Sequence, residues 1–114
     1  MGYCLLCATL LSYVNLIHQG DSSMPTLVIV DLTPIDKTLL SEYSALAAET
    51  LKPFKGRFMA KGAIDVLHGE ANHPMKVVIE FPDKDSAKGW YSSAEYQAII
   101  PLREQGMRSQ FHLV

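Results

Sequence analysis

Cysteine is scarce in this sequence, which excludes some ways of holding a small protein together. The two cysteines, Cys4 and Cys7, lie near the start of the chain, so disulfides do not hold the rest of the fold. They form a C-x-x-C pair, but a zinc site needs about four ligands, and His18 would add only a third. A redox pair would need a thioredoxin-like context that is missing. We therefore interpret the pair as a coincidence and expect no metal and no cofactor.

Runs of like charge are also missing. The chain has ten basic and twelve acidic residues and a formal net charge of −2. Nucleic-acid-binding domains usually show a basic stripe, and proteins held at a membrane surface often carry a polybasic cluster. The sequence therefore argues against nucleic-acid binding, and against membrane binding by residues 24–114. A chain of 114 residues allows one domain.

Residues 1–23 differ from the rest because they carry almost no charge. The stretch 3–17 is nearly all apolar, and the first charged side chain is Asp21. This run is shorter than the roughly 20 residues that span a bilayer, and it lacks the basic start and the cleavage site of a secretory signal. Residues 1–23 are therefore an apolar extension of uncertain kind ahead of a domain at 24–114.

Three interpretations of this extension stay open. An upstream translation start would add a leader to a protein that naturally begins at Met24, and this interpretation is favoured. An atypical signal or anchor would make the protein exported or membrane-anchored. A helix could instead pack on the domain or its partner. We expect a cytoplasmic protein unless the segment acts as a signal.

The hydrophobic pattern of residues 24–114 predicts an α+β fold. Alternating or β-branched stretches predict strands, and apolar residues at helical spacing predict helices. We expect the first helix to begin with Thr33 as its cap and Pro34 in its first turn. Asp83 can cap the second helix, and the stretch from Ser92 to Glu95 has the spacing of a capping box for the third. Gly62 suggests a bulge, and Pro101 suggests a kink or a short break. The predicted strands are residues 26–32, 56–68, 76–81 and 109–114, and the predicted helices are residues 34–54, 84–92 and 93–106.

This order, β-α-β-β-α(α)-β, is the ferredoxin-like βαββαβ pattern with a four-stranded antiparallel sheet. Helices cover one face of such a sheet, so strands open on the other face should alternate apolar and polar. The stretches 27–30 and 77–79 are instead apolar throughout. We therefore expect a second copy to cover the open face and form a dimeric α+β barrel. The alternative is that residues 1–23 cover it.

Alternation along each strand divides the sheet residues into two faces. The apolar face, expected against the helices, carries Val28, Val30, Phe58, Ala60, Val77, Ile79, Phe81, Phe111 and Leu113. The mixed face carries Leu27, Ile29, Asp31, Arg57, Met59, Lys61, Val78, Glu80, Gln110 and His112. Apolar walls with a few converging polar groups are typical of a ligand cavity, so the mixed face is the candidate site. Cross-strand ion pairs at a wet interface explain the same charges.

For the aromatic and histidine residues outside the strands, we expect structural roles. We expect Trp90 in the core and His68 and His73 in solvent near a turn. Tyr91 and Tyr96 could line the mouth of a pocket, but packing is the favoured role for both.

Several motifs are specific enough to suggest a relationship. They include Met24-Pro25, the run Ile-Glu-Phe-Pro at 79–82, and the run from Trp90 to Gln97. With these motifs the chain resembles the family catalogued as domain of unknown function 1330. The resemblance implies a dimeric α+β barrel, a superfamily that includes cofactor-free monooxygenases, isomerases and haem-handling enzymes, but it implies no settled activity. The chain departs from the family at Ala63, where a glycine is common, and at Ala71, where many members have tryptophan.

Three functional hypotheses follow. The first is a homodimer that binds a small organic ligand, either as a binding protein or as a cofactor-free enzyme, with Arg57 or Lys61 holding an anionic group and Glu80 as base or orienting acceptor. The second is a non-catalytic dimeric module with a regulatory or stress-related role. The third is haem binding through His112. Further candidates for ligand contact are Asp31, Tyr91, Tyr96, Arg103 and His112.

Overall fold

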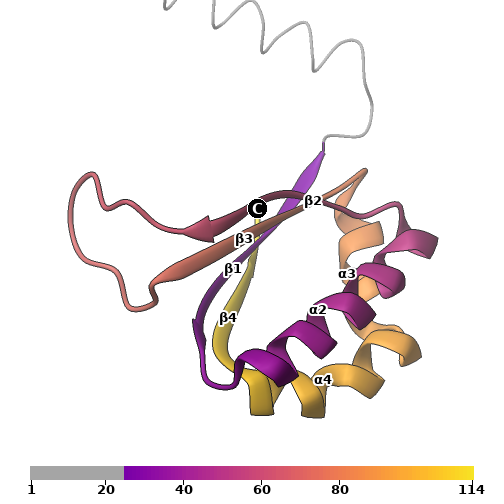
Figure 1. Cartoon of the computed structure of the whole chain (residues 1–114). Coiled ribbons are helices and arrows are strands. Elements are labelled where there is room, and N and C mark those ends of the chain that lie inside the picture. The colour runs from indigo at the N-terminus through magenta and orange to yellow at the C-terminus, as the bar shows by residue number, and fades with distance from the viewer. Residues whose placement is uncertain (1–24) are drawn as a thin grey trace, which may run out of the picture.

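The computed structural model describes residues 25–114. Predictions for residues 1–23, including Cys4, Cys7 and His18, lie outside this part of the chain. The elements follow one another in the predicted order (Figure 1). They are β1 (Thr26–Pro34), α2 (Lys37–Leu51), a short 3-10 turn (Lys52–Phe54), β2 (Arg57–Ala63), β3 (Met75–Phe81), α3 (Lys84–Ser92), α4 (Ala94–Gly106) and β4 (Met107–Leu113).

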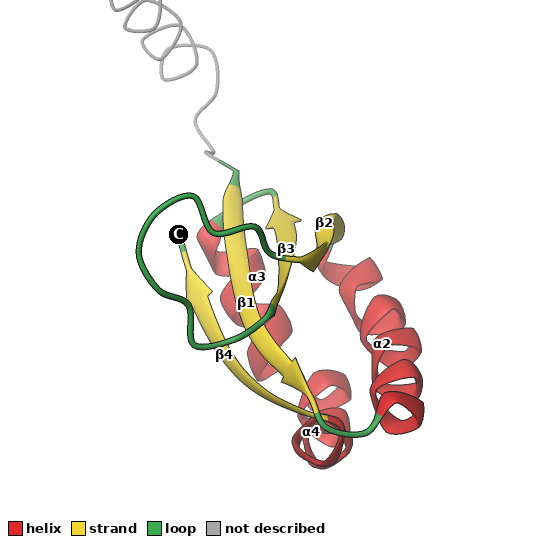
Figure 2. Ribbon diagram, turned by 60° about the vertical axis from the view of Figure 1, so that its left-hand side comes forward, coloured by secondary structure: helices red, strands yellow, loops and turns green. Residues whose placement is uncertain are grey.

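The sheet has four strands in the order β2-β3-β1-β4, and all neighbouring strands are antiparallel. The helices lie on one face of this sheet (Figure 2). The fold is therefore the predicted ferredoxin-like α+β arrangement. Its other face, called the open face below, has no helix over it in residues 25–114.

The junction between β1 and α2 differs from the prediction. Pro34 is the last residue of β1, opposite Met107, and Asp36 is the N-cap of α2, whose carboxylate accepts from the Leu39 N–H. Thr33 and Pro34 remain in the strand because β4 pairs with β1 up to this point. The prediction that Thr33 caps the helix was wrong, because strand pairing outweighs the local capping preference.

Helices α3 and α4 begin at side-chain caps, the first at the predicted Asp83 and the second one residue after the predicted Ser92. Asp83 accepts from the Ser86 N–H, and Ser93 accepts from the Tyr96 N–H. The bounds of α3 agree with the prediction. Helix α4 runs through Pro101 to Gly106, so the proline does not divide it.

Strand β2 contains the irregularity that decides the position of the site. Its register against β3 shifts between Phe58 and Ala60. Gly62 was the expected bulge, but the extra residue is Met59. The strand also ends at Ala63, not at residue 68, and the 64–74 loop, called the arm below, extends on the open-face side (Figures 1 and 2).

The core lies between the helices and the sheet. Its largest fully buried side chains are Trp90, Tyr96 and Phe81. The Trp90 indole packs on Phe81 at 5.4 Å and on Tyr96 at 4.3 Å between ring centroids. The Trp90 indole N–H donates to the Thr50 hydroxyl at 2.9 Å. Trp90 is thus a core residue, as predicted, and it ties α3 to the C-terminal half of α2.

Gly106 allows the two long helices to approach closely. A Cβ at this position would lie 2.9 Å from the Leu40 backbone nitrogen and 3.2 Å from the Leu39 carbonyl carbon. The Gly106 carbonyl also accepts from the Ile35 and Asp36 N–H groups at 2.9 and 3.1 Å. The start of α2 is therefore fixed against the end of α4.

Substituting Gly106 with alanine tests this contact. The added methyl meets backbone atoms that cannot rotate away, so we expect Gly106→Ala to lower the free energy of unfolding by about 1–3 kcal/mol. Gly89→Ala is the matched control, because its Cβ would meet only the Phe54 ring, at 3.3 Å. We expect the control to change stability by less than about 1 kcal/mol. Chemical denaturation measures both, and equal effects would contradict the close approach.

Candidate functional site

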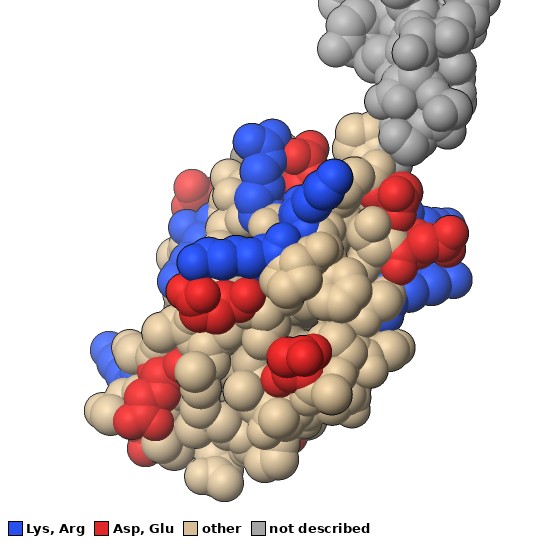
Figure 3. Space-filling model, turned by 90° about the vertical axis from the view of Figure 1, so that its right-hand side faces the viewer, with Lys and Arg blue, Asp and Glu red and all other residues tan. Residues whose placement is uncertain are grey.

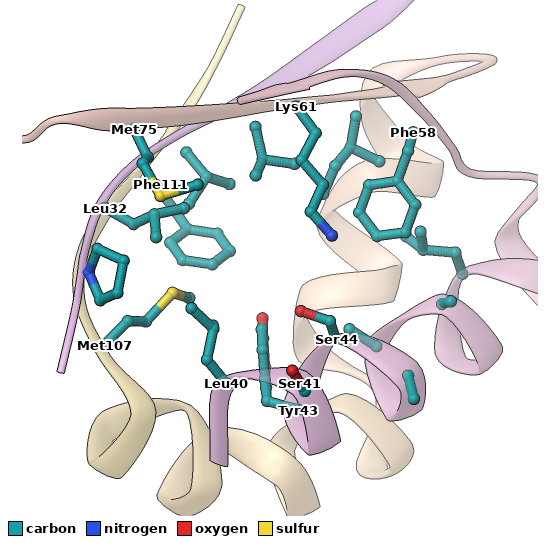
Figure 4. Close-up of a pocket in the computed structure, with 18 of the residues that line it drawn as sticks. Leu32, Leu40, Ser41, Tyr43, Ser44, Phe58, Lys61, Met75, Met107 and Phe111 are labelled. Atoms are coloured by element: carbon teal, nitrogen blue, oxygen red, sulfur yellow. The ribbon is translucent and has the colours of Figure 1, made fainter. Parts of the chain in front are cut away.

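A cavity of about 670 Å³ lies between α2 and the helix-covered face of the sheet (Figure 4). On the sheet side it meets large apolar side chains, among them Leu32, Phe58, Met75 and Phe111. Apolar walls of this extent are typical of sites for small organic molecules. The cavity lies on the opposite side of the sheet from the pocket predicted on the mixed face, and that pocket stays a prediction.

The cavity exists because α2 presents small side chains toward the sheet. Ser41, Ser44, Ala45 and Ala48 all line it from the helix. Side chains of this size leave space where leucine or phenylalanine would fill the core. At one end α2 is held by its contact with Gly106, and at the other by the Trp90–Thr50 hydrogen bond. The helix spans the cavity between these two attachments.

Lys61 reaches this cavity from β2, and its ammonium group points toward α2 (Figure 4). Strict alternation had placed Lys61 on the open face and Ala60 on the apolar face. The bulge at Met59 reverses both, because Ala60 pairs with Val78 and Lys61 with Val77. These two assignments were wrong. A single inserted residue moves every later side chain of a strand to the other face.

A buried chain of polar groups begins at the cavity wall. The Tyr43 hydroxyl lies 2.6 Å from the Tyr96 hydroxyl. Arg103 donates from Nη1 to the Tyr96 and Tyr91 hydroxyls at 3.1 Å each, and from Nη2 to the Glu104 carboxylate at 2.7 Å. Tyr91, Tyr96 and Arg103 were candidate residues from the sequence, but Tyr43 was not, because its helical spacing indicated only a core position.

Burial governs the protonation of this network. It raises the pKa of Tyr43 above the usual range, with the neighbouring Tyr96 adding to the effect. Burial likewise raises the pKa of Tyr96, although hydrogen bonds to Tyr43 and Arg103 oppose it. Burial alone would lower the pKa of Arg103, but its hydrogen bonds to Glu104, Tyr91 and Tyr96 raise it. Both phenols are therefore neutral and Arg103 is charged at ordinary pH.

The candidate catalytic residues Arg57 and Glu80 lie on the open face, away from this cavity. They pair across β2 and β3, with Arg57 Nε 2.7 Å from Glu80 Oε1. Asp31 pairs similarly with Lys76 at 3.2 Å on the same sheet. These contacts are cross-strand ion pairs, the alternative interpretation of the mixed face. A catalytic role for Glu80 and Arg57 stays a prediction.

The histidines do not point to a cofactor site in this cavity. His112 is exposed on β4, and no histidine is among the described residues that line the cavity. His73 lies in the arm and is half-buried. Its Nδ1 is 2.8 Å from the Thr33 hydroxyl. Its predicted place in solvent was therefore wrong. In residues 25–114 no group of three or more His, Cys, Asp or Glu side chains could hold a metal ion.

Charges of both signs share the surface beside α2 and α3. Lys and Arg side chains gather in the upper half of this face, with Asp and Glu side chains next to them (Figure 3). Among the helices of residues 25–114, none is long and apolar enough to cross a membrane.

The fold is shared with solved structures of low sequence identity. A protein of unknown function from Rhodopseudomonas palustris matches with a TM-score of 0.67 at 10% identity, covering 90% of both chains. A dimeric ferredoxin-like protein of unknown function from Thermobifida fusca matches with a TM-score of 0.56 at 11% identity, covering 81% of this chain and 91% of that one. The chain is thus an α+β protein of the ferredoxin-like class.

A third similar structure is SnoaB, a cofactor-independent oxygenase from Streptomyces nogalater. It matches with a TM-score of 0.59 at 10% identity and covers 79% of this chain and 90% of its own. Among curated proteins, none matches this chain in sequence. The family model for the domain of unknown function DUF1330 matches residues 25–114, and the chain therefore belongs to that family.

The pH dependence of stability tests the buried hydroxyl pair. Because folding raises the pKa of Tyr43 and Tyr96, the contribution of the pair is fully present below the ordinary tyrosine pKa of about 10. Above that pH the unfolded chain releases protons that the folded chain keeps, so the free energy of unfolding falls. We expect the denaturant midpoint to fall between about pH 9 and about pH 11.

The variant that carries both Tyr43→Phe and Tyr96→Phe is the control for this titration. It removes the two buried phenols and should show a clearly smaller fall over the same pH interval. An equal fall in the variant would assign the effect to other groups.

Proposed function

We propose that this protein is a homodimer in which each chain binds a small, mainly apolar organic molecule with an anionic group. The ligand occupies the cavity between α2 and the sheet, and Lys61 pairs with its anionic group. The observation that carries the proposal is the Lys61 ammonium group pointing into a cavity with otherwise largely apolar walls (Figure 4).

The side chains that line the cavity can adapt to apolar ligands of different shape. Met75 and Met107 lie on the sheet side and Leu40 on α2. Methionine side chains are unbranched and polarisable, so they adapt to ligands of different shape. Lys61 is on the edge strand β2, where its ammonium group can meet a carboxylate or a similar anion close to solvent. A molecule with an apolar ring system and one anionic group matches this distribution.

A second copy of the chain is the proposed cover for the open face. Leu27, Ile29 and Val78 are only half-buried there, although they lie on the central strands of the sheet. The arm on the same side carries Leu67 and Val66, which are 99% and 55% exposed. Two open faces packed together would remove this apolar surface from water. The Thermobifida fusca protein with a similar fold is dimeric, which supports a dimer in general.

Catalysis without a cofactor is part of the same proposal. SnoaB is a cofactor-independent oxygenase, so a fold of this kind can support such chemistry with protein groups alone. Here the groups that face the ligand would be Lys61, Lys37 and the hydroxyls of α2. The alternative is a non-catalytic dimeric module, which is favoured by the ion pairs Arg57–Glu80 and Asp31–Lys76 on the open face.

Binding of 2-naphthoate tests the role of Lys61. We expect Lys61→Met to raise the Kd of this anion by roughly threefold to tenfold and to leave the Kd of uncharged 2-ethylnaphthalene unchanged. Isothermal titration calorimetry measures both. Lys84→Met is the control for loss of one positive charge, because Lys84 is exposed on α3 and does not line the cavity.

Arg57→Met separates the two candidate sites. Arg57 is on the same strand as Lys61 but on the opposite face. A site in the helix-side cavity predicts that Lys61→Met weakens naphthoate binding and Arg57→Met does not. The reverse result would restore the open-face site inferred from the sequence and contradict the proposal.

The oligomeric state tests the role of the open face. We expect the full chain to be a dimer and Ile29→Lys to be a monomer, because Ile29 lies on a central strand between His112 and Val78. Leu46→Lys is the control, since Leu46 is 46% exposed on α2. Native mass spectrometry measures the oligomeric state and reveals any retained ligand. A dimer that survives Ile29→Lys, or a monomeric wild type, would contradict this interface.

A further inference from the structure

The buried network of two tyrosines and an arginine has a direction. An arginine side chain donates hydrogen bonds and cannot accept them. Arg103 Nη1 lies 3.1 Å from the Tyr96 hydroxyl oxygen, so this oxygen is the acceptor. The Tyr96 hydroxyl keeps one proton of its own, and the Tyr43 hydroxyl is 2.6 Å away.

Burial decides which of the two hydroxyls donates the hydrogen bond to the other. If Tyr43 donated to Tyr96, the Tyr96 proton would have no acceptor among residues 25–114, although Tyr96 is 0% exposed. A buried donor without an acceptor destabilises the folded state, because it has lost the hydrogen bond that it makes to water in the unfolded chain. If Tyr96 donates instead, the Tyr43 hydroxyl hydrogen is not used within the pair and can bond to a further acceptor. Tyr43 lines the cavity, and its hydroxyl end points away from α2 toward the cavity (Figure 4).

We propose that Tyr43 is a hydrogen-bond donor to the ligand in this cavity, that it binds an oxygen acceptor of the ligand, and that Arg103 and Tyr96 are positioning residues that orient its proton. The inference rests on the proposed function and adds a second recognition point to it. Lys61 selects an anion by charge, whereas Tyr43 selects a carbonyl or enolate oxygen by hydrogen bonding. The ligand class is therefore an apolar molecule with an anionic group and, apart from it, a ketone-type oxygen.

The energetics of Arg103 support a role beyond packing. Arg103 is 8% exposed, and its Nε is buried without a hydrogen-bond partner in the described part of the chain. The guanidinium lies 4.8 Å from the centroid of the Phe111 ring. A buried charge with incomplete hydrogen bonding is costly, and an apolar residue would fill the space at lower cost. A hydrogen-bond chain that starts at a charge also strengthens the donor at its far end.

The donor works as a neutral group. Burial raises the pKa of Tyr43, so the phenol keeps its proton at ordinary pH. It can therefore stabilise negative charge that develops on a ligand oxygen, as preorganised donors do in enzymes. Proton transfer from Tyr43 is not part of this inference.

The test uses Prodan, a neutral naphthyl ketone whose fluorescence moves to longer wavelength when its carbonyl accepts a hydrogen bond. The full chain is titrated with Prodan and, separately, with 2-ethylnaphthalene, which has no oxygen. We expect Prodan bound to wild type to emit at longer wavelength than Prodan bound to Tyr43→Phe. We also expect Tyr43→Phe to raise the Kd of Prodan by roughly threefold to tenfold, with no change for 2-ethylnaphthalene.

Three further variants define the result. Tyr91→Phe removes a hydroxyl that bonds the same Arg103 nitrogen but does not line this cavity, and it should keep the wild-type emission. Tyr96→Phe leaves the Tyr43 hydroxyl in place and should give a shift between wild type and Tyr43→Phe. Ala48→Trp fills the cavity and should abolish binding of both probes.

Several outcomes would overturn the inference. One is that Prodan bound to wild type emits as it does in an aprotic apolar solvent. This measurement does not depend on whether any variant folds. Another is an equal loss of both probes in Tyr43→Phe, which would show a packing role only. Binding retained in Ala48→Trp would place the dye elsewhere. If neither probe binds wild type, the proposed function fails as well, whereas binding of both with no effect of Tyr43→Phe overturns this inference alone.

Discussion

The contact between the end of α4 and the start of α2 is the constraint on which the site depends. Gly106 has no side chain, so Leu40 approaches its Cα closely, and its carbonyl accepts two N–H groups from the residues before α2. This contact fixes one end of α2, and the Trp90–Thr50 hydrogen bond holds the other. Between the two attachments the helix carries serine and alanine toward the sheet, and a cavity stays open. A larger residue at Gly106 would move α2 and alter the cavity without touching it.

The two faces of the sheet have separate physical roles. On the helix side, apolar burial is interrupted by Lys61 at one wall and by the Tyr43–Tyr96–Arg103 network at another. On the open side, charges pair across strands around half-buried aliphatic residues. Surface ion pairs of this kind contribute little to stability. We propose the helix-side cavity for the ligand and the open face for the partner.

Much of the fold was predictable from local pattern. The element order, the cap of α3 at Asp83 and the bounds of that helix follow from residue types at fixed spacing. Predictions failed where pairing between distant segments competed with local preference. Thr33 and Pro34 have the chemistry of a helix start, but β4 holds them in a strand. Lys61 was assigned to the wrong face for a related reason, because alternation was counted through the bulge at Met59.

The sequence by itself determined the ferredoxin-like α+β class, the family, the core position of Trp90, and the membership of Tyr91, Tyr96 and Arg103 in the set of candidate residues. These follow from periodicity, caps and motifs, which are local properties of the chain. Only the tertiary structure decided where the cavity lies, that Lys61 enters it, and that Tyr43 connects it to Arg103. Strand register and the spacing between α2 and the sheet arise from contacts between segments far apart in sequence, and no local pattern encodes them.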